Sequence, residues 1–325
     1  AEYKGIHGTK IQNYTSDPDN PLQGQVWYNE TANTLKYFYV DTGAWATGGD
    51  LNIGRRVYTG AGTQTAALTF GGGPTSDPTI SPGANVALTE SYNGSTWTEL
   101  NDMNTARRYL GGCGTQTAAL AVGGYVAGSV ANVETWDGTS WTETTDIPNA
   151  KRGMAMAGTN TAALSFGCSD PSPRNAETES WNGTSWTELN DLNTGRGYLE
   201  GCGTQTAGLA FGGEPPVNTL TESWNGTSWT AVNALNNGRK TCAGFGTQTA
   251  ALIAGGGSSP YQKTESWNGT NWTELGTLNV GRSYVAGCGT NTSGLAFGGF
   301  PPDPPVGVST EEWNAGPATV TITTD

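Results

Sequence analysis

The chain is poor in several residue types on which enzyme centres and membrane spans depend. Only 13% of its 325 residues are charged, and histidine occurs once, at His7. No apolar run approaches the roughly 20 residues of a membrane-spanning helix, so we do not expect membrane insertion. Residues 1–40 show no basic region followed by an apolar stretch, so no signal peptide is predicted. His7 lies in the non-repeating segment, which excludes a Ser-His-Asp mechanism from the repeated part of the chain. We interpret His7 as a surface residue.

The charge balance is acidic. Fifteen Lys and Arg residues stand against 28 Asp and Glu residues, for a net charge of −13. This field repels phosphate backbones and anionic lipid headgroups, so neither nucleic acid nor an anionic membrane is an expected partner. The acidic residues are spread along the chain in repeated positions such as Glu179, Glu222 and Glu265. We interpret them as residues that provide solubility.

Glycine and tryptophan are abundant instead, at 49 and 12 residues, and both follow a repeat. The phrase TESWNGTSWTELNDLNTGR, from Thr178 to Arg196, recurs nearly unchanged from Thr221 and from Thr264. Its second tryptophan recurs about every 44 residues, and a basic residue follows it by ten positions. These basic residues are Arg55, Arg107, Lys151, Arg196, Arg239 and Arg282. A second phrase of the type GTQTAALAVGG follows each of them, beginning at Gly62, Gly114, Gly158, Gly203, Gly246 and Gly289.

Each repeat predicts four short strands. In the second repeat we place them at residues 109–113, 118–122, 133–136 and 141–143. An Asn-Gly or Asp-Gly pair joins the last two in a tight hairpin, in which both central residues need positive φ. The frequent glycines interrupt any apolar series with a helical period, so no helix is predicted. Four-stranded antiparallel units repeated radially are the blades of a β-propeller, so the predicted fold class is an all-β propeller.

The number of blades depends on the two ends of the chain. Six repeats favour six blades, yet residues 35–47 carry a surplus hairpin with Trp45 in register. Residues 312–314 and 319–323 are able to complete the sixth repeat without it, and a seventh blade that includes residues 25–28 is the open alternative. We favour six blades whose closure the two termini share. The predicted domains are a non-repeating docking segment, 1–34, and a propeller, 35–325, closed by residues 35–47, 310–325 or both.

The order of features in each repeat resembles the kelch repeat. A basic residue comes first, Gly-Gly follows the second strand, an aromatic residue stands in the third strand, and Trp-x-x-Leu follows. The resemblance extends from Arg55 to about Trp313. It implies that the glycines let strands crowd together and that the tryptophans fill the space between blades. A pair of large aromatic side chains suits blades that are too small to have a core of their own.

Two further resemblances concern the source of the protein. The segment PLQGQVWYN, Pro21 to Asn29, with TLKY at Thr34 to Tyr37, resembles a short segment of bacteriophage virion proteins near the ends of fibre and appendage subunits. The ESWNGTSWTELNDLNT repeats are similar to kelch-type proteins encoded by marine bacteriophages. Both resemblances imply a structural virion component without enzymatic activity, located in the virion after assembly in the host cytoplasm.

Propeller enzymes provide the alternatives to a binding protein. The copper site of galactose oxidase, a kelch-type propeller, needs two histidines, and this chain has one. The SWNGTSW segments resemble the Asp box of sialidases but are one residue short. A carboxylate pair for glycoside hydrolysis would break the repeat symmetry. Asp77, Asp170 and Asp303 do break it, but they stand in Pro-rich or Ser-rich loops where Asp is an ordinary turn residue. We therefore predict no enzymatic activity and no cofactor.

The five cysteines follow the repeat in part. Cys113, Cys202 and Cys288 share one position in alternate repeats, so their blades are not neighbours and direct pairing exceeds the reach of a disulfide. Without CxxC spacing or nearby histidines, no zinc site or other metal site is expected. We predict that the cysteines are small buried apolar residues, which fits assembly in a reducing cytoplasm.

Candidate binding residues lie in the variable loops. Antiparallel strands place the uniform Gly-Thr-Gln-Thr and Asn-Gly-Thr-Ser turns on one face, and the loops of unequal length on the other. Recognition usually occurs on variable loops that a rigid scaffold holds. The candidates are Tyr125, Arg174, Tyr261, Gln262, Phe300 and Asp303. The repeated basic residues either form a ring of charge near the channel mouth or bond to neighbouring loops, and we favour the second.

Two classes of function remain. The first, which we favour, is a virion appendage protein of a fibre, tail or capsid surface that is oligomeric within an assembly. Its residues 1–34 would contact other virion proteins, and its propeller a host-surface glycan or receptor. The alternative is a secreted or cell-surface kelch lectin, with an extracellular location. An intracellular substrate adaptor is a third reading, but the BTB-type partner domain of such adaptors is missing.

Overall fold

The computed structural model describes residues 11–18, 25–40, 43–56, 58–75, 84–170, 175–257, 261–300, 307–315 and 317–322. The chain divides into two compact units, one of residues 44–314 and one of residues 1–43 and 315–325. The secondary structure of the described residues consists of β-strands, and no helix there is able to cross a membrane.

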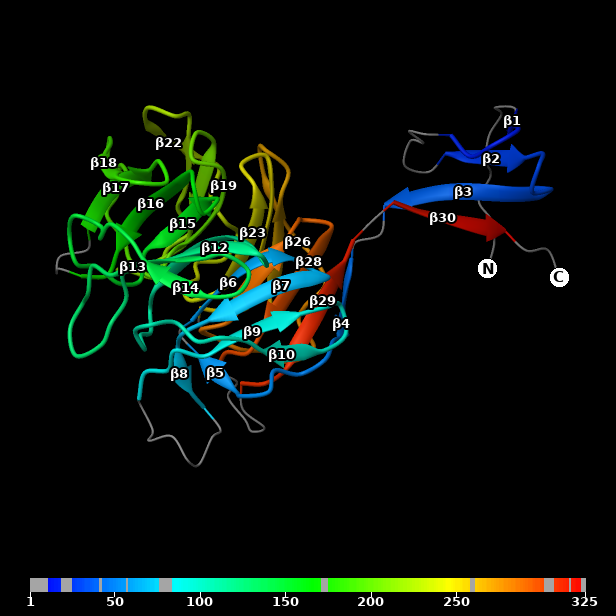
Figure 1. Cartoon of the computed structure of the whole chain (residues 1–325). Coiled ribbons are helices and arrows are strands. Elements are labelled where there is room, and N and C mark those ends of the chain that lie inside the picture. Colours follow the sequence, from blue (N-terminus) through cyan, green and yellow to red (C-terminus); the bar gives the residue numbers. More distant parts are fainter. Residues whose placement is uncertain are drawn as a thin grey trace. The chain divides into compact units, whose positions relative to one another are not determined.

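Six four-stranded antiparallel sheets make up the unit of residues 44–314 and are the blades of a β-propeller. Blades one to five follow one another along the chain (Figure 1).

Blade one consists of β6 (Thr59–Thr63), β7 (Ala66–Phe70), β9 (Thr89–Tyr92) and β10 (Trp97–Glu99), and a short pair, β5 (Arg55–Arg56) and β8 (Gly73–Pro74), flanks it. Blade two consists of β11 (Gly111–Thr115), β12 (Ala118–Val122), β13 (Val133–Trp136) and β14 (Trp141–Glu143). Blade three consists of β15 (Ala155–Gly158), β16 (Ala163–Cys168), β17 (Asn175–Trp181) and β18 (Trp186–Glu188). Blade four consists of β19 (Glu200–Gly203), β20 (Gly208–Phe211), β21 (Thr221–Trp224) and β22 (Trp229–Val232). Blade five consists of β23 (Ala243–Thr247), β24 (Ala250–Ala254), β25 (Thr264–Trp267) and β26 (Trp272–Glu274).

The sixth blade joins strands from both ends of the chain. It consists of β27 (Ala286–Gly289), β28 (Ser293–Phe297), β29 (Thr310–Asn314) and, outermost, β4 (Ala44–Thr47). β4 runs antiparallel to β29 with Trp45 opposite Trp313, and the two strands lie side by side in Figure 1. The inner strands β6, β11, β15, β19, β23 and β27 contact one another in this order, and β27 contacts β6 again. The preferred prediction of six blades closed by both termini is confirmed.

Tryptophan pairs connect each blade to the one before it. The third-strand and fourth-strand tryptophans lie opposite each other across the hairpin, as Trp181 and Trp186 do in blade three with ring centroids 5.2 Å apart. The fourth-strand indole also reaches the preceding blade: Trp229 packs on Phe166 at 4.8 Å and donates from Nε1 to Thr178 Oγ1 at 3.0 Å. The same bond recurs between four further pairs, Trp45 to Thr264, Trp97 to Thr310, Trp141 to Thr89 and Trp272 to Thr221. The buried apolar clusters therefore lie between neighbouring blades.

The hairpin that joins the third and fourth strands is confirmed, with one difference in its backbone. In blade three Gly183 has φ +95°, but the preceding Asn182 is not in the positive region. Its Oδ1 accepts hydrogen bonds from the amides of Thr184 and Ser185, at 3.0 and 2.9 Å. The asparagine therefore stabilises the turn by its side chain, and only the glycine supplies the left-handed conformation.

The predicted first strand begins two residues late in the structure. We expected it at residues 109–113 of blade two, but β11 spans Gly111–Thr115. Tyr109 has φ +56°, a left-handed conformation that interrupts a strand. The other three strands of this blade match their predicted bounds.

The second unit is a four-stranded sheet of its own. It orders β1 (Gln12–Tyr14), β2 (Val26–Asn29), β3 (Thr34–Val40) and β30 (Pro317–Ile322), and the β1–β2 pair is parallel. Asp17 accepts hydrogen bonds from the buried Trp27, from Asn29 and from Lys36 at 2.7–3.1 Å. These bonds lower the pKa of Asp17 to about 2, with Lys36 as the largest cause.

This sheet changes the expected domain boundaries. β3 and β30 pair with each other, from Leu35 opposite Ile322 to Val40 opposite Pro317, so neither belongs to the propeller. The expected boundary at 34/35 moves to 43/44, and the propeller ends at Asn314. Residues 25–28 do not start a seventh blade, because β2 pairs with β3 in the separate sheet. Residues 319–322 do not complete the sixth blade, because they pair with β3 from the other end of the chain.

Candidate functional site

The propeller has two different faces. The turns between the first and second strands and between the third and fourth strands lie on one face, which we call the turn face. The loops between the second and third strands, and the links from each blade to the next, lie on the other, which we call the loop face. β5 and β8 lie on the loop face (Figure 1).

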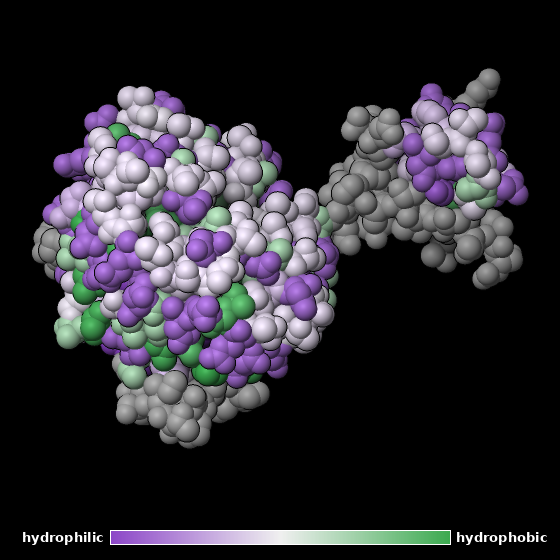
Figure 2. All heavy atoms as spheres, viewed as in Figure 1, coloured by the Kyte–Doolittle hydropathy of each residue, from purple (hydrophilic) through white to green (hydrophobic). Residues whose placement is uncertain are grey.

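The loop face carries the exposed apolar side chains of the propeller. Among its described residues, every large hydrophobic side chain that is exposed belongs to a loop of this face, namely Val126, Val217, Leu220, Val280 and Phe300. Figure 2 shows hydrophobic residues gathered toward the end where β5 and β8 lie in Figure 1, with hydrophilic residues between them. Apolar surface rimmed by polar groups is typical of interaction sites.

Three tyrosines from alternate blades meet at the mouth of the central channel on this face. Tyr109, Tyr198 and Tyr284 stand two positions after the basic residue of repeats two, four and six. The ring centroids of Tyr109 lie 5.5 Å from Tyr198 and 6.3 Å from Tyr284, in edge-on arrangements. Burial raises the pKa of both Tyr109 and Tyr284. All three have φ between +52° and +56°, so the side chains turn toward the channel mouth and not onto a blade surface.

A chain of backbone hydrogen bonds holds these tyrosines around the axis. The Gly153 amide donates to Tyr109 O, and the Tyr198 amide to Gly153 O, both at 2.8 Å. Thr241 and Tyr284 continue the chain, with bonds of 3.2 and 2.8 Å. These bonds run from blade to blade and fix the mouth as one rigid collar.

A second position around the mouth carries cations in some repeats only. The residue directly after the repeated basic residue is Arg56, Arg108, Arg152, Gly197, Lys240 and Ser283 in repeats one to six. The guanidinium of Arg152 lies 4.7 Å and that of Arg108 lies 5.1 Å from the ring centre of Tyr125. Arg56 lies 5.1 Å from the ring centre of Phe300. Lys240 instead forms an ion pair with Glu214.

Two predicted site residues, Tyr125 and Phe300, take equivalent places at this mouth. Tyr125 exchanges backbone hydrogen bonds of 2.7 and 3.2 Å with Arg108, and Phe300 exchanges bonds of 2.7 and 3.1 Å with Ser283. Each begins the loop between the second and third strands of its blade. Phe300 is 43% exposed and Tyr125 is half-buried under its arginines.

The predicted residues Tyr261 and Gln262 are not at the mouth. The backbone oxygens of Tyr261 and Gln262 accept bonds from the amides of Arg282 and Leu278, at 3.1 and 2.9 Å. Both residues therefore pack against the link into blade six, away from the tyrosine collar. Arg174 and Asp303 lie outside the described residues.

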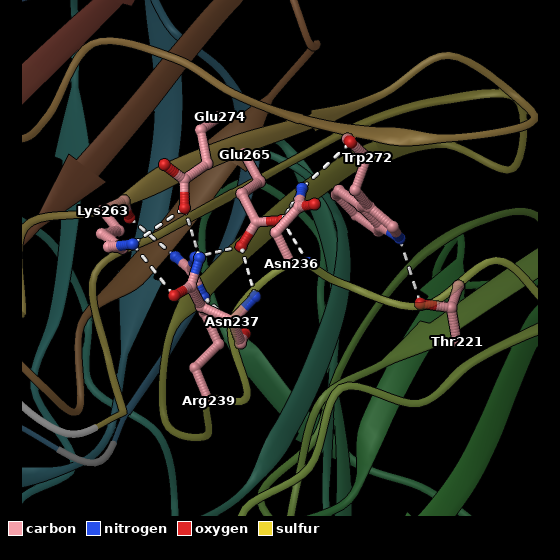
Figure 3. A network of polar contacts seen from close by, with 8 residues as sticks. All are labelled: Thr221, Asn236, Asn237, Arg239, Lys263, Glu265, Trp272 and Glu274. Atoms are coloured by element: carbon pink, nitrogen blue, oxygen red, sulfur yellow. Dashed lines mark hydrogen bonds and ion pairs between the residues drawn. The ribbon is translucent and has the colours of Figure 1, made fainter.

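The repeated basic residues themselves are buried in ion pairs, as Figure 3 shows for Arg239 and Glu265. The second carboxylate oxygen of Glu265 accepts bonds from the amide and the Nδ2 of Asn236, at 2.8 and 2.9 Å. Asn236 Nδ2 also donates to Trp272 O at 3.0 Å. The network thus connects the link between blades four and five to both outer strands of blade five.

The same pair occurs in all six blades. The pairs are Arg55–Glu90, Arg107–Glu134, Lys151–Glu179, Arg196–Glu222, Arg239–Glu265 and Arg282–Glu311. The interpretation of Glu179, Glu222 and Glu265 as solubility residues is wrong, because all three are at most 2% exposed. The alternative of a ring of free charge at the channel mouth is also wrong, since the pairs neutralise the six bases.

Among the described residues that line the channel below the collar, Glu200 is the one carboxylate, and it departs from the repeat. Cavities of about 80 and 110 Å³ lie between the inner strands, and Glu200 lines both of them. Glycine or alanine stands at the matching position in blades two, three, five and six, as with Gly111 and Ala286. Desolvation raises the pKa of Glu200 well above its ordinary value.

The cysteines are buried, as predicted. All five are free thiols, and Cys113, Cys202 and Cys288 donate to backbone oxygens of the following blade at 3.4–3.6 Å. Burial raises the pKa of the Cys113 thiol to about 12. Within the described part of the chain, no three His, Cys, Asp or Glu side chains converge as ligands for a metal ion.

Sequence reasoning did not find Arg56, Arg108, Arg152 or the tyrosine collar. A signal was present: the repeats read Arg-Arg, Arg-Arg, Lys-Arg, Arg-Gly, Arg-Lys and Arg-Ser, so the second residue of each pair departs from the repeat. Only the first residue of each pair follows the repeat, and that residue is the base that lies buried in an ion pair.

No protein-family model matches the chain, and no curated protein is significantly similar to it.

Proposed function

We propose that this protein is a non-enzymatic structural or appendage component of a bacteriophage virion, built on a kelch-type propeller. Its loop face binds a host surface or a neighbouring subunit, and its N-terminal unit docks on other virion proteins. The resemblances of residues 21–37 and of the repeats to virion proteins support the source. The difference between the two faces of the propeller supports the binding role.

The observation that carries the binding role is the asymmetry of the loop face. The turn face repeats the same short polar turns in nearly every blade, as expected of an architectural surface. The loop face carries five exposed apolar side chains, the tyrosine collar and two arginines stacked on Tyr125. A scaffold that keeps its repeat everywhere except on one face is typical of a recognition module.

The docking role rests on the independent sheet of the N-terminal unit. β3 and β30 pair over six positions, so both ends of the propeller chain enter one compact unit. A unit of this kind is a suitable attachment point, since it does not use the loop face.

The test is the presence of the chain in purified particles. Peptide mass spectrometry of virions from a phage that encodes this chain should detect it in stoichiometric amounts. Purified full-length protein should bind the host cells, and residues 44–314 alone should bind cells but not join particles. Absence from particles combined with binding to carbohydrate would favour the alternative, a secreted or cell-surface kelch lectin.

A further inference from the structure

The arginines at the loop-face mouth differ from the other cations of the propeller. The six repeated bases are neutralised by buried glutamates, Lys240 pairs with Glu214, and Lys263 pairs with Glu274. Neither Arg56 nor Arg152 forms an ion pair with a carboxylate of the described residues. In a chain of net charge −13, cations without a carboxylate partner are candidates for contact with an anionic ligand.

Their partners are aromatic rings. Arg56 stacks on Phe300, and Arg152 shares the ring of Tyr125 with Arg108. A cation–π contact fixes the position of a guanidinium without cancelling its charge or occupying the N–H groups at its edge. Such a group is ready to donate two parallel hydrogen bonds to a carboxylate or a sulfate.

The scaffold beneath Tyr125 is rigid. Its loop folds back, with Val130 N donating to Gly124 O at 2.9 Å. Asn85 of the blade-one loop donates to Val126 O at 2.9 Å, and Ser129 bonds to Asp170 of the blade-three loop. Loops from three blades therefore hold one aromatic ring and its arginines in place, which reduces the entropy lost on binding.

The repeat itself provides an internal comparison. Position by position, Arg56–Phe300, Arg152–Tyr125 and Lys240–Glu214 are the same contact, each from the second basic position to the preceding blade. In the third case a glutamate neutralises the cation. Arginine occupies the position in three consecutive blades, one to three, so the charge gathers on one side of the mouth.

We propose that Arg56 and Arg152, stacked on Phe300 and Tyr125, bind the carboxylate or sulfate groups of an acidic polysaccharide. This inference rests on the proposed function and names the ligand class of the loop face. The exposed apolar surfaces of Val126 and Phe300 suit the C–H faces of sugar rings beside the charged groups. A nucleic acid is also a polyanion and meets the same negative field of the whole protein, so double-stranded DNA is the competing ligand in the test.

The test is binding of the purified full-length protein to four polymers on biosensor surfaces. Polygalacturonate presents carboxylates, dextran sulfate presents sulfates, and plain dextran and double-stranded DNA are the comparisons. The two acidic polysaccharides, or one of them, should bind, dextran should not, and binding should weaken as salt is raised. The preferred polymer identifies the anionic group.

Variants connect the binding to this site. Arg56→Gln and Arg152→Gln should each weaken binding by about tenfold, because each removes a charge-assisted hydrogen-bond donor. Arg152→Lys should recover part of the loss, since it keeps the charge without the planar fork. The matched control is Lys240→Gln with Glu214→Gln, which leaves net charge unchanged and should bind like the parent. Thermal unfolding of each variant identifies any that fail to fold.

Three results would overturn the inference. They are unchanged binding by a folded Arg56→Gln/Arg152→Gln variant, equal binding to plain dextran, and stronger binding to DNA than to either acidic polysaccharide. Host-cell binding that survives loss of both arginines would reject the polysaccharide site but leave the proposed function standing. Loss of cell binding in all forms, with absence from virions, would reject the proposed function itself.

Discussion

Trp45 of β4 packs against Trp313 of β29 with ring centroids 5.4 Å apart, and its indole donates to Thr264 at 2.9 Å. These contacts join a strand near the start of the chain to the last blades of the ring. The propeller is closed by side-chain packing across distant sequence, and its stability should depend on this one short strand.

Truncation tests the closure directly. A fragment of residues 44–314 retains β4 and should unfold cooperatively like the full chain, as followed by circular dichroism. A fragment of residues 48–314 differs only by Ala44–Thr47 and should be destabilised, because β29 gains an unpaired edge. Equal melting temperatures of the two fragments would contradict closure by β4.

Substitution of single tryptophans gives a finer comparison. Trp45→Ala should cost about 3–5 kcal/mol of unfolding free energy, because Trp45 is buried between two blades. Trp186→Ala is the matched control: it has the same repeat position but is only partly buried, and it bonds to Thr145 O. Its cost should be about 1–2 kcal/mol in urea denaturation.

The buried ion pair of blade two should show strong coupling. Arg107→Met leaves the Glu134 carboxylate buried without its cation and should cost about 3–5 kcal/mol. Adding Glu134→Gln should recover part of this loss, because the amide oxygen can still accept bonds from Asn104. Denaturant unfolding of the two single variants and the double variant measures the coupling. Additive costs would show that the pair is not a unit.

Glu200 should make the propeller less stable as pH rises. Its folded pKa lies above the unfolded value of about 4.3, so the folded state favours the neutral acid. The penalty is absent below the unfolded pKa, grows above it, and is complete above the raised folded pKa. Glu200→Gln should therefore match the parent near pH 4 and exceed it in unfolding free energy at pH 8. Glu188→Gln, at an exposed position of strand β18, controls for the effect of the substitution itself.

Asp17 should make the N-terminal unit less stable as pH falls, the opposite of the effect of Glu200 in the propeller. Its pKa is lowered to about 2, so its contribution to stability is present above the ordinary value near 3.9 and is lost as pH falls toward 2. An NMR titration of the carboxyl carbon should give a midpoint near 2. Lys36→Met should raise this midpoint, since Lys36 is the largest cause of the shift. An unchanged midpoint in the variant would contradict the assigned contacts.

The repeat made the propeller predictable from the sequence. Glycine-rich inner strands, the Asn-Gly turn and paired tryptophans each specify a local structure, and their period of about 44 residues specifies the blade. Three of the four predicted strands of blade two match the structure to the residue. Burial of Cys113, Cys202 and Cys288 followed from the same pattern, since these small residues stand on the crowded inner strands.

The tertiary structure decided which terminal strands pair and which charged residues are buried, because the repeat pattern does not distinguish them. The structure pairs β3 with β30 and β4 with β29, a choice that the local pattern left open because both strands stood in one predicted hairpin. The sequence pattern indicated that the repeated glutamates are surface charges, but in the fold each of them is buried beside a base. The sequence by itself determined a β-propeller of four-stranded blades and favoured six of them, and the structure decided the number. Only the fold brought Arg152 onto Tyr125, and Arg56 onto Phe300 from the far end of the chain, because contacts between blades join residues that no local pattern connects.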